Sequence, residues 1–421
     1  MKKIYLSQAK ICSLRGLDLK RLTEYFLKNN YTIVDNPKEA EIIVLSTCAY
    51  SNERANYSLN SVKKFLKYDA ELIVIGCLPE TEKEELAKIF DGKKISTKDL
   101  DRIDNLFPEN KIKFLDIKDQ NIPWSELQTY CISEFAGDSL GHKSSRELYH
   151  KIQNFILKFF LKNSPIPYYR DKFCLEKVYY LRLSRGCLGN CAYCSIKRAI
   201  GSLESKPMET IISEFESGLD QGYKNFVLIA DDLGAYGLDT EKTFPDIVNE
   251  LSQIPGKYKI ELRNIHPVWV VKYVDEIEKI LKIGKINAIF SSIQSGNERI
   301  LKLMNRFSDV KKMRDTFFML KNTYPDLLLG TDCIIGFPTE TMEEYMDSLN
   351  FIKIAGFDMG SLLPFSSKNA TLAEKIEPKI DNEEIRKRVN ISKKLLKKWG
   401  YKVYYGDIFG RSNMLAFRKN Q

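Results

Sequence analysis

The chain has 421 residues, of which 43% are hydrophobic and 29% are charged, and this composition excludes a disordered or a fibrous protein. At roughly 100–200 residues per domain, the length allows two to four domains. The net charge is +9, and residues 385–421 carry 11 basic side chains against a single acid. No apolar run reaches the roughly 18 residues that span a bilayer, and the first residues lack the hydrophobic core of a signal peptide. We therefore expect a soluble, cytoplasmic protein with no membrane partner.

The first hundred residues alternate short apolar runs with helical patterns, which is typical of an α/β domain with a parallel sheet. Strands are predicted over residues 3–6, 31–34, 41–45 and 72–75, and helices over 17–28, 57–67 and 82–90. This pattern predicts a small, doubly wound, flavodoxin-like domain, in which ligands bind at the carboxyl ends of the strands. Cys12, Cys48 and Cys77 each come shortly after a predicted strand, so we expect them at one edge of the sheet. For any one of them alone, a buried small hydrophobic residue is the simpler interpretation.

The second half of the chain predicts a partial (β/α)6 barrel, whose site would lie on the loops at the strand carboxyl ends. Its six strands are expected at residues 178–183, 226–230, 258–262, 286–292, 327–335 and 358–365. The predicted domains are an α/β domain (1–118), a linker or inserted helical segment (119–175) with an amphipathic helix over 146–162, and the barrel (176–380). The last segment (381–421) is predicted to be a basic helix over 382–399 followed by a short tail. Cys131 and Cys174 match no pattern and are interpreted as structural.

Three more cysteines lie together in the loop after the first barrel strand. Cys187, Cys191 and Cys194 are spaced as Cys-x3-Cys-x2-Cys in the run SRGCLGNCAYCSIK. Soft thiolates at this spacing suit an iron–sulfur cluster or zinc. A structural zinc takes four protein ligands, and no fourth His or Cys follows nearby, so a cluster with one open iron is favoured. The alternative is a zinc knuckle completed by Cys174.

This motif after a first barrel strand resembles that of the radical S-adenosylmethionine (radical SAM) enzymes. The resemblance implies a [4Fe–4S] cluster that binds S-adenosyl-L-methionine (SAM) and cleaves it to a 5′-deoxyadenosyl radical, with an electron donor such as flavodoxin or ferredoxin. Tyr193 stands where that family has an aromatic residue near the adenine, although a packing tyrosine is an equal alternative.

Both domains together resemble the methylthiotransferases, a radical SAM subfamily that modifies tRNA or ribosomal protein. The matching stretches are LSTCAYSNERA, VIGCLPE, RGCLGNCAYCSI, VLIADDLGAYGLD, SIQSGNERILKLMNR and GTDCIIGFPTETMEEY. The resemblance implies a second [4Fe–4S] cluster, held by Cys12, Cys48 and Cys77, and a reaction that inserts sulfur as a methylthio group at an unactivated C–H bond.

Further cofactor-binding candidates follow the later barrel strands. Asp231 and Asp232 could accept hydrogen bonds from the ammonium group of SAM, although a helix cap or a solvated loop is the alternative. Arg263 is a candidate partner for a carboxylate. The remaining candidates are short polar residues near the ribose and a turn near the adenine, namely Gln294, Ser295 and Gly336.

Two departures from the family bear on the substrate. The chain has LESKP at residues 203–207 where the family has Arg-Ser-Arg-Pro, and too few residues follow the last helix for the usual carboxyl-terminal β-barrel substrate domain. The basic tail would attract nucleic acid or an acidic peptide, or would simply be solvated. The segment VLIADDLGAYGLD is more similar to the protein-modifying branch, which favours a peptide or protein substrate over tRNA adenosine.

Two other functions remain as alternatives. A cobalamin-dependent radical SAM methyltransferase would carry a cobalt-binding histidine in an Asp-x-His-x-x-Gly stretch of its amino-terminal domain, whereas the first histidine here is His142. A non-catalytic iron–sulfur protein that binds RNA would make no 5′-deoxyadenosine.

Overall fold

The computed structural model describes residues 2–9, 12–123, 178–405 and 414–419. The helix expected over residues 146–162, together with Cys131 and Cys174, lies outside the described residues. The chain divides into two compact units, Met1–Phe160 with Ser195–Gly201, and Leu161–Cys194 with Ser202–Gln421. Within the described part of the chain, no helix is both long and apolar enough to cross a membrane.

The amino-terminal unit is built on a five-stranded parallel sheet. Its strands are β1 (Lys3–Gln8), β2 (Thr32–Ile33), β3 (Ile42–Thr47), β4 (Glu71–Gly76) and β5 (Lys93–Ser96), in the order β2-β1-β3-β4-β5. This order is that of flavodoxin-like sheets and confirms the predicted fold class. The sequence analysis did not predict β5.

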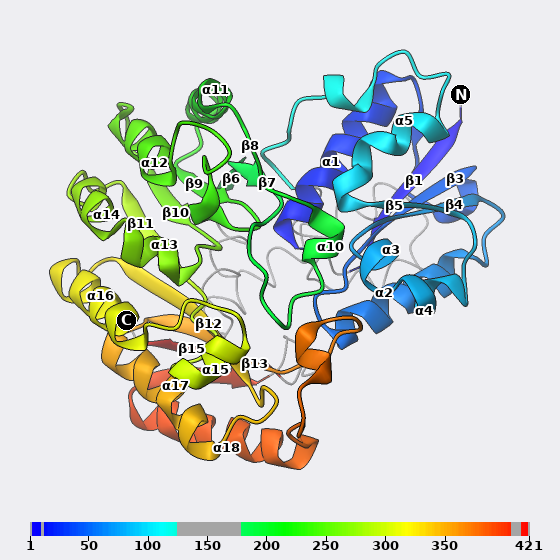
Figure 1. The fold of residues 1–421 in the computed structure, drawn as a ribbon. Coiled ribbons are helices and arrows are strands. Elements are labelled where there is room, and N and C mark those ends of the chain that lie inside the picture. The colour runs from blue at the N-terminus through cyan, green and yellow to red at the C-terminus, as the bar shows by residue number, and fades with distance from the viewer. Residues whose placement is uncertain (1, 10–11, 124–177, 406–413, 420–421) are drawn as a thin grey trace. The chain divides into compact units, whose positions relative to one another are not determined.

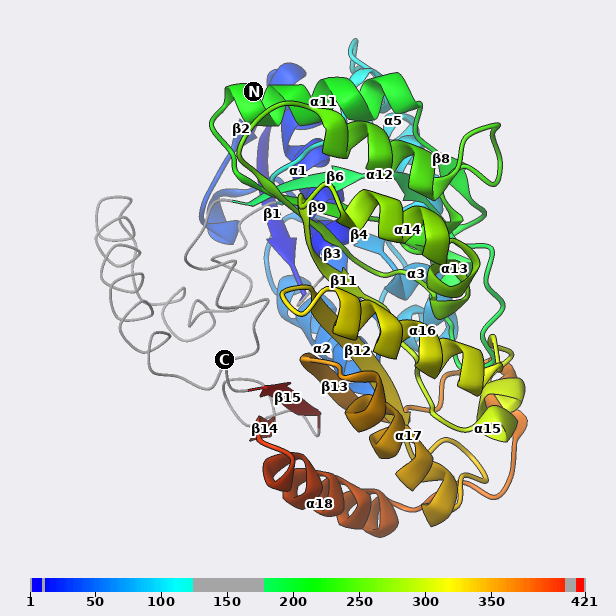
Figure 2. The ribbon, with the colours of Figure 1, turned by 90° about the vertical axis from the view of Figure 1, so that its left-hand side faces the viewer.

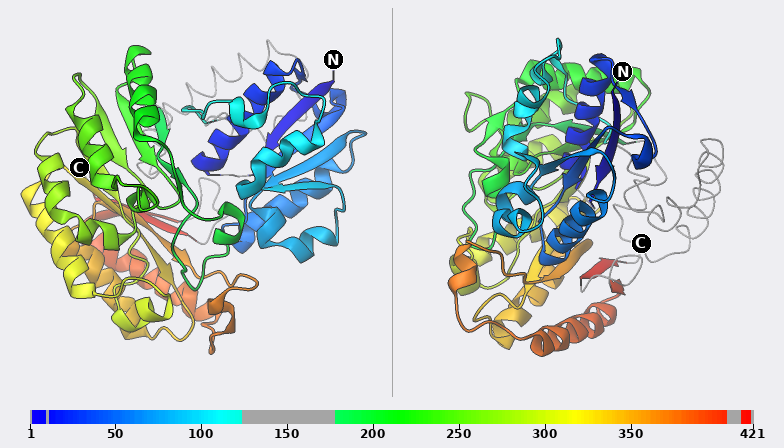
Figure 3. Two further views of the ribbon diagram at one scale, coloured as in Figure 1. Left: turned by 45° about the horizontal axis from the view of Figure 1, so that its top comes forward. Right: turned by 90° about the vertical axis from the view of Figure 1, so that its right-hand side faces the viewer.

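Helices cover both faces of this sheet, as Figure 3 shows. On β3, Ile42 and Val44 belong to one core and Ile43 and Leu45 to the other, so consecutive side chains face opposite layers. The first core lies under α1 (Ser13–Lys28) and α5 (Ile103–Leu106), and the second lies under α2 (Asn52–Phe65), α3 (Leu78–Thr81) and α4 (Lys83–Ala87). In place of the single helix expected over 82–90, the chain forms two short helices, of which α3 precedes the expected range and α4 lies within it. Short 3-10 turns occur at Pro37–Glu39, Thr97–Arg102 and Phe114–Asp116, and the short helix α10 (Lys197–Ile200) completes the unit.

The carboxyl-terminal unit is a partial barrel of six parallel strands. They are β6 (Val178–Arg182), β9 (Asn225–Ile229), β10 (Lys259–Leu262), β11 (Ile286–Phe290), β12 (Leu328–Ile335) and β13 (Met359–Pro364), paired in chain order. All six strand predictions and the (β/α)6 architecture are confirmed. The helices outside the sheet (Figure 1) are α11 (Met208–Asp220), α12 (Phe244–Gln253), α13 (Pro267–Lys272), α14 (Val274–Leu281), α15 (Glu298–Leu303), α16 (Val310–Thr323) and α17 (Met342–Ala355). A small antiparallel pair, β7 (Ser184–Arg185) and β8 (Glu204–Ser205), follows β6.

The barrel sheet continues into the carboxyl-terminal residues, where the sequence analysis predicted only a tail. After α18 (Asn382–Lys398), β14 (Tyr401–Tyr405) pairs with β15 (Leu415–Lys419), and β15 pairs antiparallel with β13. Figure 2 shows α18 beside these two strands. α18 also has an apolar face, on which Ile385, Val389 and Leu396 are buried.

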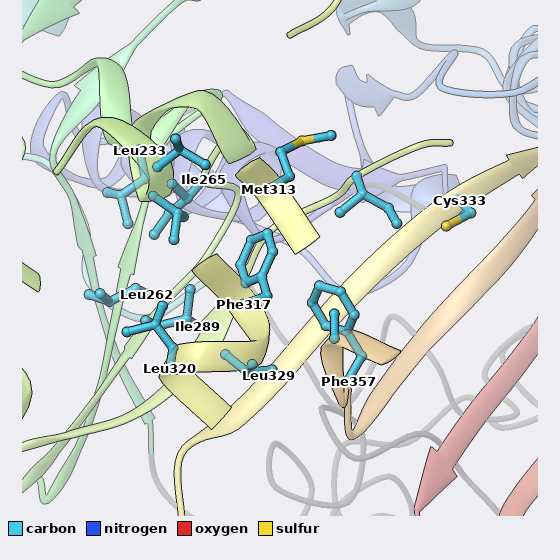
Figure 4. Close-up of a cluster of buried hydrophobic side chains, with 14 of the residues drawn as sticks. Leu233, Leu262, Ile265, Ile289, Met313, Phe317, Leu320, Leu329, Cys333 and Phe357 are labelled. Carbon is cyan, nitrogen blue, oxygen red and sulfur yellow. The ribbon is translucent and has the colours of Figure 1, made fainter. Parts of the chain in front are cut away.

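The main core lies between the barrel sheet and its helices. Phe317 and Leu320 of α16 pack there with Leu329 of β12, as Figure 4 shows. Cys333 is only 1% exposed in this cluster and is therefore a core residue.

A buried ion pair fastens α18 to the turn after β12. Arg388 Nη1 donates to Glu340 Oε2 at 2.7 Å, and Nη2 donates to the Glu340 backbone oxygen at 2.8 Å. The Gly336 N–H donates to the same carboxylate oxygen at 2.8 Å. The two side chains are 3% and 0% exposed, so the buried charge of Glu340 depends on Arg388 for its compensation, whereas Arg388 also donates from Nε to Glu384 Oε1 at 3.0 Å.

Replacing Arg388 with alanine is expected to lower the free energy of unfolding by about 3–5 kcal/mol, because Glu340 would stay buried without its cation. Chemical denaturation followed by circular dichroism measures the loss. Lys387→Ala is the matched control, since this side chain lies on the same helix, is 65% exposed and sits 3.6 Å from Glu384. That control should change stability by less than about 0.5 kcal/mol. Equal losses in the two variants would show that the ion pair does not stabilise α18.

Candidate active site

The loop after β6 brings cysteine sulfurs together around a glycine. A Cβ added at Gly189 would lie 3.2 Å from Cys187 Sγ and 3.8 Å from Cys191 Sγ, so the two sulfurs flank the same residue. The Gly189 N–H donates to Cys187 Sγ at 3.1 Å, and the Cys194 N–H donates to the Cys191 backbone oxygen at 3.0 Å. Burial raises the pKa of Cys187 to about 11, and the charges of Asp232, Cys191 and Cys194 add to the effect. The thiolates therefore need a nearby positive charge, such as a metal centre, to coexist.

Backbone contacts fix this loop against the end of α15. The Ala192 N–H donates to the Met304 oxygen at 2.9 Å, and Asn305 Nδ2 donates to the Asn190 oxygen at 2.8 Å. The Ala192 oxygen in turn accepts from the Ala373 N–H at 2.9 Å. The loop is thus held from two sides of the barrel unit.

Arg306, which the sequence analysis did not single out, reaches into the loop. Its Nη1 donates to Tyr193 Oη at 3.1 Å and contacts Cys191 Sγ at 3.5 Å, and its Nη2 donates to the Ser292 oxygen at 2.7 Å. The stretch SIQSGNERILKLMNR ends on this residue, and that position at the end of a matching stretch is the signal that could have found it.

Asp231 and Asp232 lie beside the cysteine loop, and both receive hydrogen bonds from the protein. Asp231 Oδ2 accepts from the Gly186 N–H at 3.0 Å, immediately before the first cysteine. Asp232 is 8% exposed and accepts from Trp269 Nε1 at 3.0 Å and from the His266 N–H at 3.3 Å. Burial raises the pKa of Asp232, against the lowering effect of these donors. The Asp231 carboxylate therefore braces the cysteine loop, whereas the Asp232 carboxylate is held by Trp269 and His266.

Gln294 and Ser295, the next two candidates, differ in whether their side chains have a polar atom available to bind a ligand. Gln294 has a φ of 67°, a backbone conformation that costs energy for a residue with a side chain. Its Oε1 is buried without a hydrogen-bond partner among the described residues, so it can accept from a ligand. Ser295 is fully buried, and its hydroxyl lies 3.3 Å from that of Ser348 and accepts from the Asn297 N–H. Ser295 thus serves packing between the loop and α17.

The other three candidates have distinct surroundings. Tyr193 packs against the main core and accepts from Arg306, which supports its place near the cysteines. Arg263 is ion-paired with Glu261 at 2.7 Å and lines a barrel cavity of about 180 Å³. Gly336, in contrast, faces α18, where an added Cβ would lie 2.7 Å from Ile385.

Cys12, Cys48 and Cys77 follow β1, β3 and β4, which are neighbours in the amino-terminal sheet. Cys48 and Cys77 come directly after Thr47 and Gly76, which pair across the strands, and the Cys77 N–H donates to the Thr47 oxygen at 3.2 Å. A Cβ at Gly76 would lie 2.4 Å from that oxygen, so glycine is required for this approach. Cys12 is exposed, whereas the other two are buried. Burial raises the pKa of Cys48, and the charge of Cys12 raises it further, so these two thiols are within electrostatic reach of each other.

Comparison with known proteins covers both units. Residues 181–352 match the radical SAM superfamily, and residues 9–96 match the uncharacterized protein family UPF0004. The chain is 26% identical over 386 residues to the ribosomal protein uS12 methylthiotransferase RimO of Thermotoga maritima, covering 90% of this chain and 79% of that protein. It is also 26% identical over 404 residues to the probable threonylcarbamoyladenosine tRNA methylthiotransferase of Methanocaldococcus jannaschii, covering 94% and 84%. These matches and relatives support the radical SAM methylthiotransferase family for this chain.

A solved structure confirms the fold of this chain. The radical SAM methyltransferase TsrM from Kitasatospora setae, solved with cobalamin and a [4Fe–4S] cluster, has a TM-score of 0.60 and covers 100% of this chain and 88% of its own. At 9% sequence identity, this similarity concerns the fold alone.

The chain is an enzyme, and its radical SAM domain implies SAM and a [4Fe–4S] cluster. The loop fits a cluster better than a single ion. Among the described residues, no three His, Cys, Asp or Glu side chains converge as they would on one metal ion. A cluster instead binds each thiolate through a different iron, and the two sulfurs on either side of Gly189 leave between them the space that a side chain would fill.

Proposed function

We propose that this chain is a two-cluster radical SAM methylthiotransferase that replaces a hydrogen on an unactivated carbon of a peptide or protein substrate with a methylthio group. The observation that carries the proposal is the second set of cysteines, Cys12, Cys48 and Cys77, at the carboxyl ends of three neighbouring strands. Ligands bind at this edge of doubly wound sheets. A lone buried cysteine needs no function, but three at adjacent strand ends suit one iron–sulfur cluster.

The reaction consumes two molecules of SAM for each product. One molecule is cleaved with one electron from flavodoxin or ferredoxin, which gives methionine and the 5′-deoxyadenosyl radical. This radical takes the hydrogen atom from the substrate and becomes 5′-deoxyadenosine. The other gives its methyl group to the sulfur and leaves as S-adenosylhomocysteine. When bound, the cluster at Cys187, Cys191 and Cys194 supplies the electron that cleaves SAM, and the cluster at Cys12, Cys48 and Cys77 supplies the sulfur.

The residues around the first cysteine loop have separate tasks in this proposal. Asp231 holds the loop through the Gly186 N–H, and both Asp231 and Asp232 offer carboxylate oxygens to the ammonium group of SAM. Gln294 offers a buried amide oxygen, which accepts no hydrogen bond from the described residues and could accept one from SAM. Tyr193 offers a ring face beside the cysteines. Arg263 presents its guanidinium to the barrel cavity, where a carboxylate could bind.

A protein substrate is favoured by two sequence comparisons. RimO of Thermotoga maritima acts, by its name, on a ribosomal protein. The Asp-x-x-Ala-Tyr-Gly segment that is similar to the protein-modifying branch begins at Asp232, beside the cysteine loop. We infer that this branch is the nearer relative in chemistry.

A tRNA substrate is the second candidate, because α18 presents a basic face. Lys393, Lys394, Lys397 and Lys398 are all exposed on this helix, and within the described chain none of them forms an ion pair. Such a face attracts phosphates in a salt-dependent way. Incubating the reduced enzyme with SAM and either ribosomal protein or tRNA decides between the two, because mass spectrometry shows which gains one sulfur and one methyl group in place of hydrogen.

The iron content tests the second cluster. Anaerobically reconstituted protein is expected to hold about eight irons per chain, and the variant with Cys12, Cys48 and Cys77 all replaced by alanine about four. Cys333→Ala is the matched control, because this cysteine is buried in the barrel core and should leave about eight. A wild-type content of about four irons, unchanged in the triple variant, would refute the two-cluster proposal.

A further inference from the structure

We propose that Arg306 is a positioning residue that sets the reduction potential of the radical SAM cluster: its guanidinium holds Cys191 by a charged hydrogen bond and supplies the local positive charge. The inference rests on the part of the proposed function that assigns this cluster to Cys187, Cys191 and Cys194. It does not depend on the second cluster or on the identity of the substrate.

The hydrogen bonds of Arg306 point to the cluster loop rather than to solvent. Nη2 is fixed by the Ser292 backbone oxygen at 2.7 Å, next to the carboxyl end of β11. Nη1 is shared between Tyr193 Oη at 3.1 Å and Cys191 Sγ at 3.5 Å. The planar guanidinium therefore bridges a barrel strand and a cysteine ligand, which a lysine ammonium does not do in the same geometry.

The charge of Arg306 has no carboxylate counterpart in the described part of the chain. It forms no ion pair there, although its side chain is only partly exposed. Burial raises the pKa of the nearby Asp232 and the charge of Arg306 opposes this rise, but that carboxylate accepts its hydrogen bonds from Trp269 and His266. Arginines in such surroundings are normally paired with an anion. Cysteine thiolates are the anions within reach.

A thiolate-ligated cluster supplies the missing negative charge. Three thiolates outweigh the positive charge of the oxidised core, and reduction by one electron adds a further negative charge. A fixed cation beside one of the sulfurs stabilises the reduced state more than the oxidised state. Hydrogen bonds to the sulfurs act in the same direction and are among the factors that set iron–sulfur potentials. Arg306 thus makes reduction by flavodoxin or ferredoxin easier.

A carboxylate of bound SAM is the competing partner for this guanidinium. In that case Arg306 would act on SAM affinity and leave the potential of the SAM-free cluster unchanged. The two roles differ in a measurable way, because the first exists without SAM and the second does not.

The test is a redox titration of the reconstituted full chain without SAM, followed by electron paramagnetic resonance. The signal that changes shape when SAM is then added belongs to the SAM-binding cluster. Arg306→Gln, which keeps hydrogen-bond donors and removes the charge, is expected to lower the potential of that signal by at least about 59 mV, a tenfold change in the one-electron equilibrium. Arg306→Lys, which keeps the charge, should restore at least half of the shift. Arg299→Gln is the matched control, since this arginine is 49% exposed and paired with Glu344, and it should leave the potential unchanged.

Each result decides the proposal. An unchanged potential in Arg306→Gln, with or without weaker binding of SAM, overturns it in favour of a SAM contact or a structural role. Loss of iron in both Arg306→Gln and Arg306→Lys also overturns it, because Arg306 would then only hold the cysteine loop in place. If Cys187→Ala retains the SAM-sensitive signal, the assignment of the cluster to this loop is wrong. This failure is detected independently of the Arg306 variants.

Discussion

Replacing Cys187 with alanine is expected to reduce the formation of 5′-deoxyadenosine from SAM to the background level. The reason is that a [4Fe–4S] cluster with an open iron needs all three thiolates of this loop, and Cys187 is the first of them. It accepts the Gly189 N–H at 3.1 Å and lies within electrostatic reach of the other two cysteines. The measurement is chromatography of 5′-deoxyadenosine after incubation of the reconstituted protein with SAM and dithionite under anaerobic conditions.

The control for this variant is Cys333→Ala, which also removes one sulfur from the barrel unit. Cys333 lies in the hydrophobic core with 1% exposure, so its loss should lower stability slightly and leave SAM cleavage intact. Undiminished 5′-deoxyadenosine in the Cys187 variant would mean that the site of SAM cleavage is elsewhere. Equal loss in both variants would indicate unfolding rather than loss of a ligand.

The parallel strands could be predicted because each is an apolar run with both faces buried. On β3, all six residues from Ile42 to Thr47 are buried, and the run is recognisable without any periodicity. The strand β5 escaped prediction because it has only four residues, two of them lysines, and only Ile95 and Ser96 are buried. Such an edge strand carries too few apolar side chains to be distinguished from a loop.

The strands β14 and β15 escaped prediction for another reason. The strand β15 pairs antiparallel with β13 through long-range contacts, such as the register of Gly360 with Phe417, and β14 pairs only with β15. A β-hairpin with a short turn carries a local signal in its turn residues, but these two strands are separated by residues 406–413. The basic composition of the region also favoured the prediction of a solvated tail, so the burial of Leu415, Ala416 and Phe417 was not predicted.

The candidate site shows the same contrast between local and long-range signals. The cysteine loop could be found because its three ligands lie within eight residues. Arg306 is 115 residues away from Cys191 and reaches it only through the packing of α15 on the loop. Ser295 and Gly336 were expected near SAM, which stays a prediction; the structure shows that the Ser295 hydroxyl contacts Ser348 and that Gly336 packs on α18. A motif locates a segment, whereas the direction of each side chain depends on the fold.

Replacing Cys48 with alanine is expected to separate the two halves of the reaction: SAM is still cleaved, and the sulfur-containing product is lost. Cys48 suits this experiment because its backbone is fixed independently of its sulfur. The Cys48 N–H donates to Ser58 Oγ at 3.1 Å, and the same hydroxyl donates to the Cys48 oxygen at 2.7 Å. Removing the thiol should therefore leave the end of β3 in place.

The reason for the separation is that SAM cleavage needs the cysteines after β6, whereas Cys48 lies in the other unit at the end of β3. Mass spectrometry of the substrate and chromatography of 5′-deoxyadenosine in the same reaction give both readouts. The Cys187 variant is the opposite control, because it should lose both products. If the Cys48 variant still delivers a methylthio group, the sulfur does not come from the amino-terminal cysteines. If it loses 5′-deoxyadenosine as well, the two cysteine sets act as one centre, and the assignment of separate tasks fails.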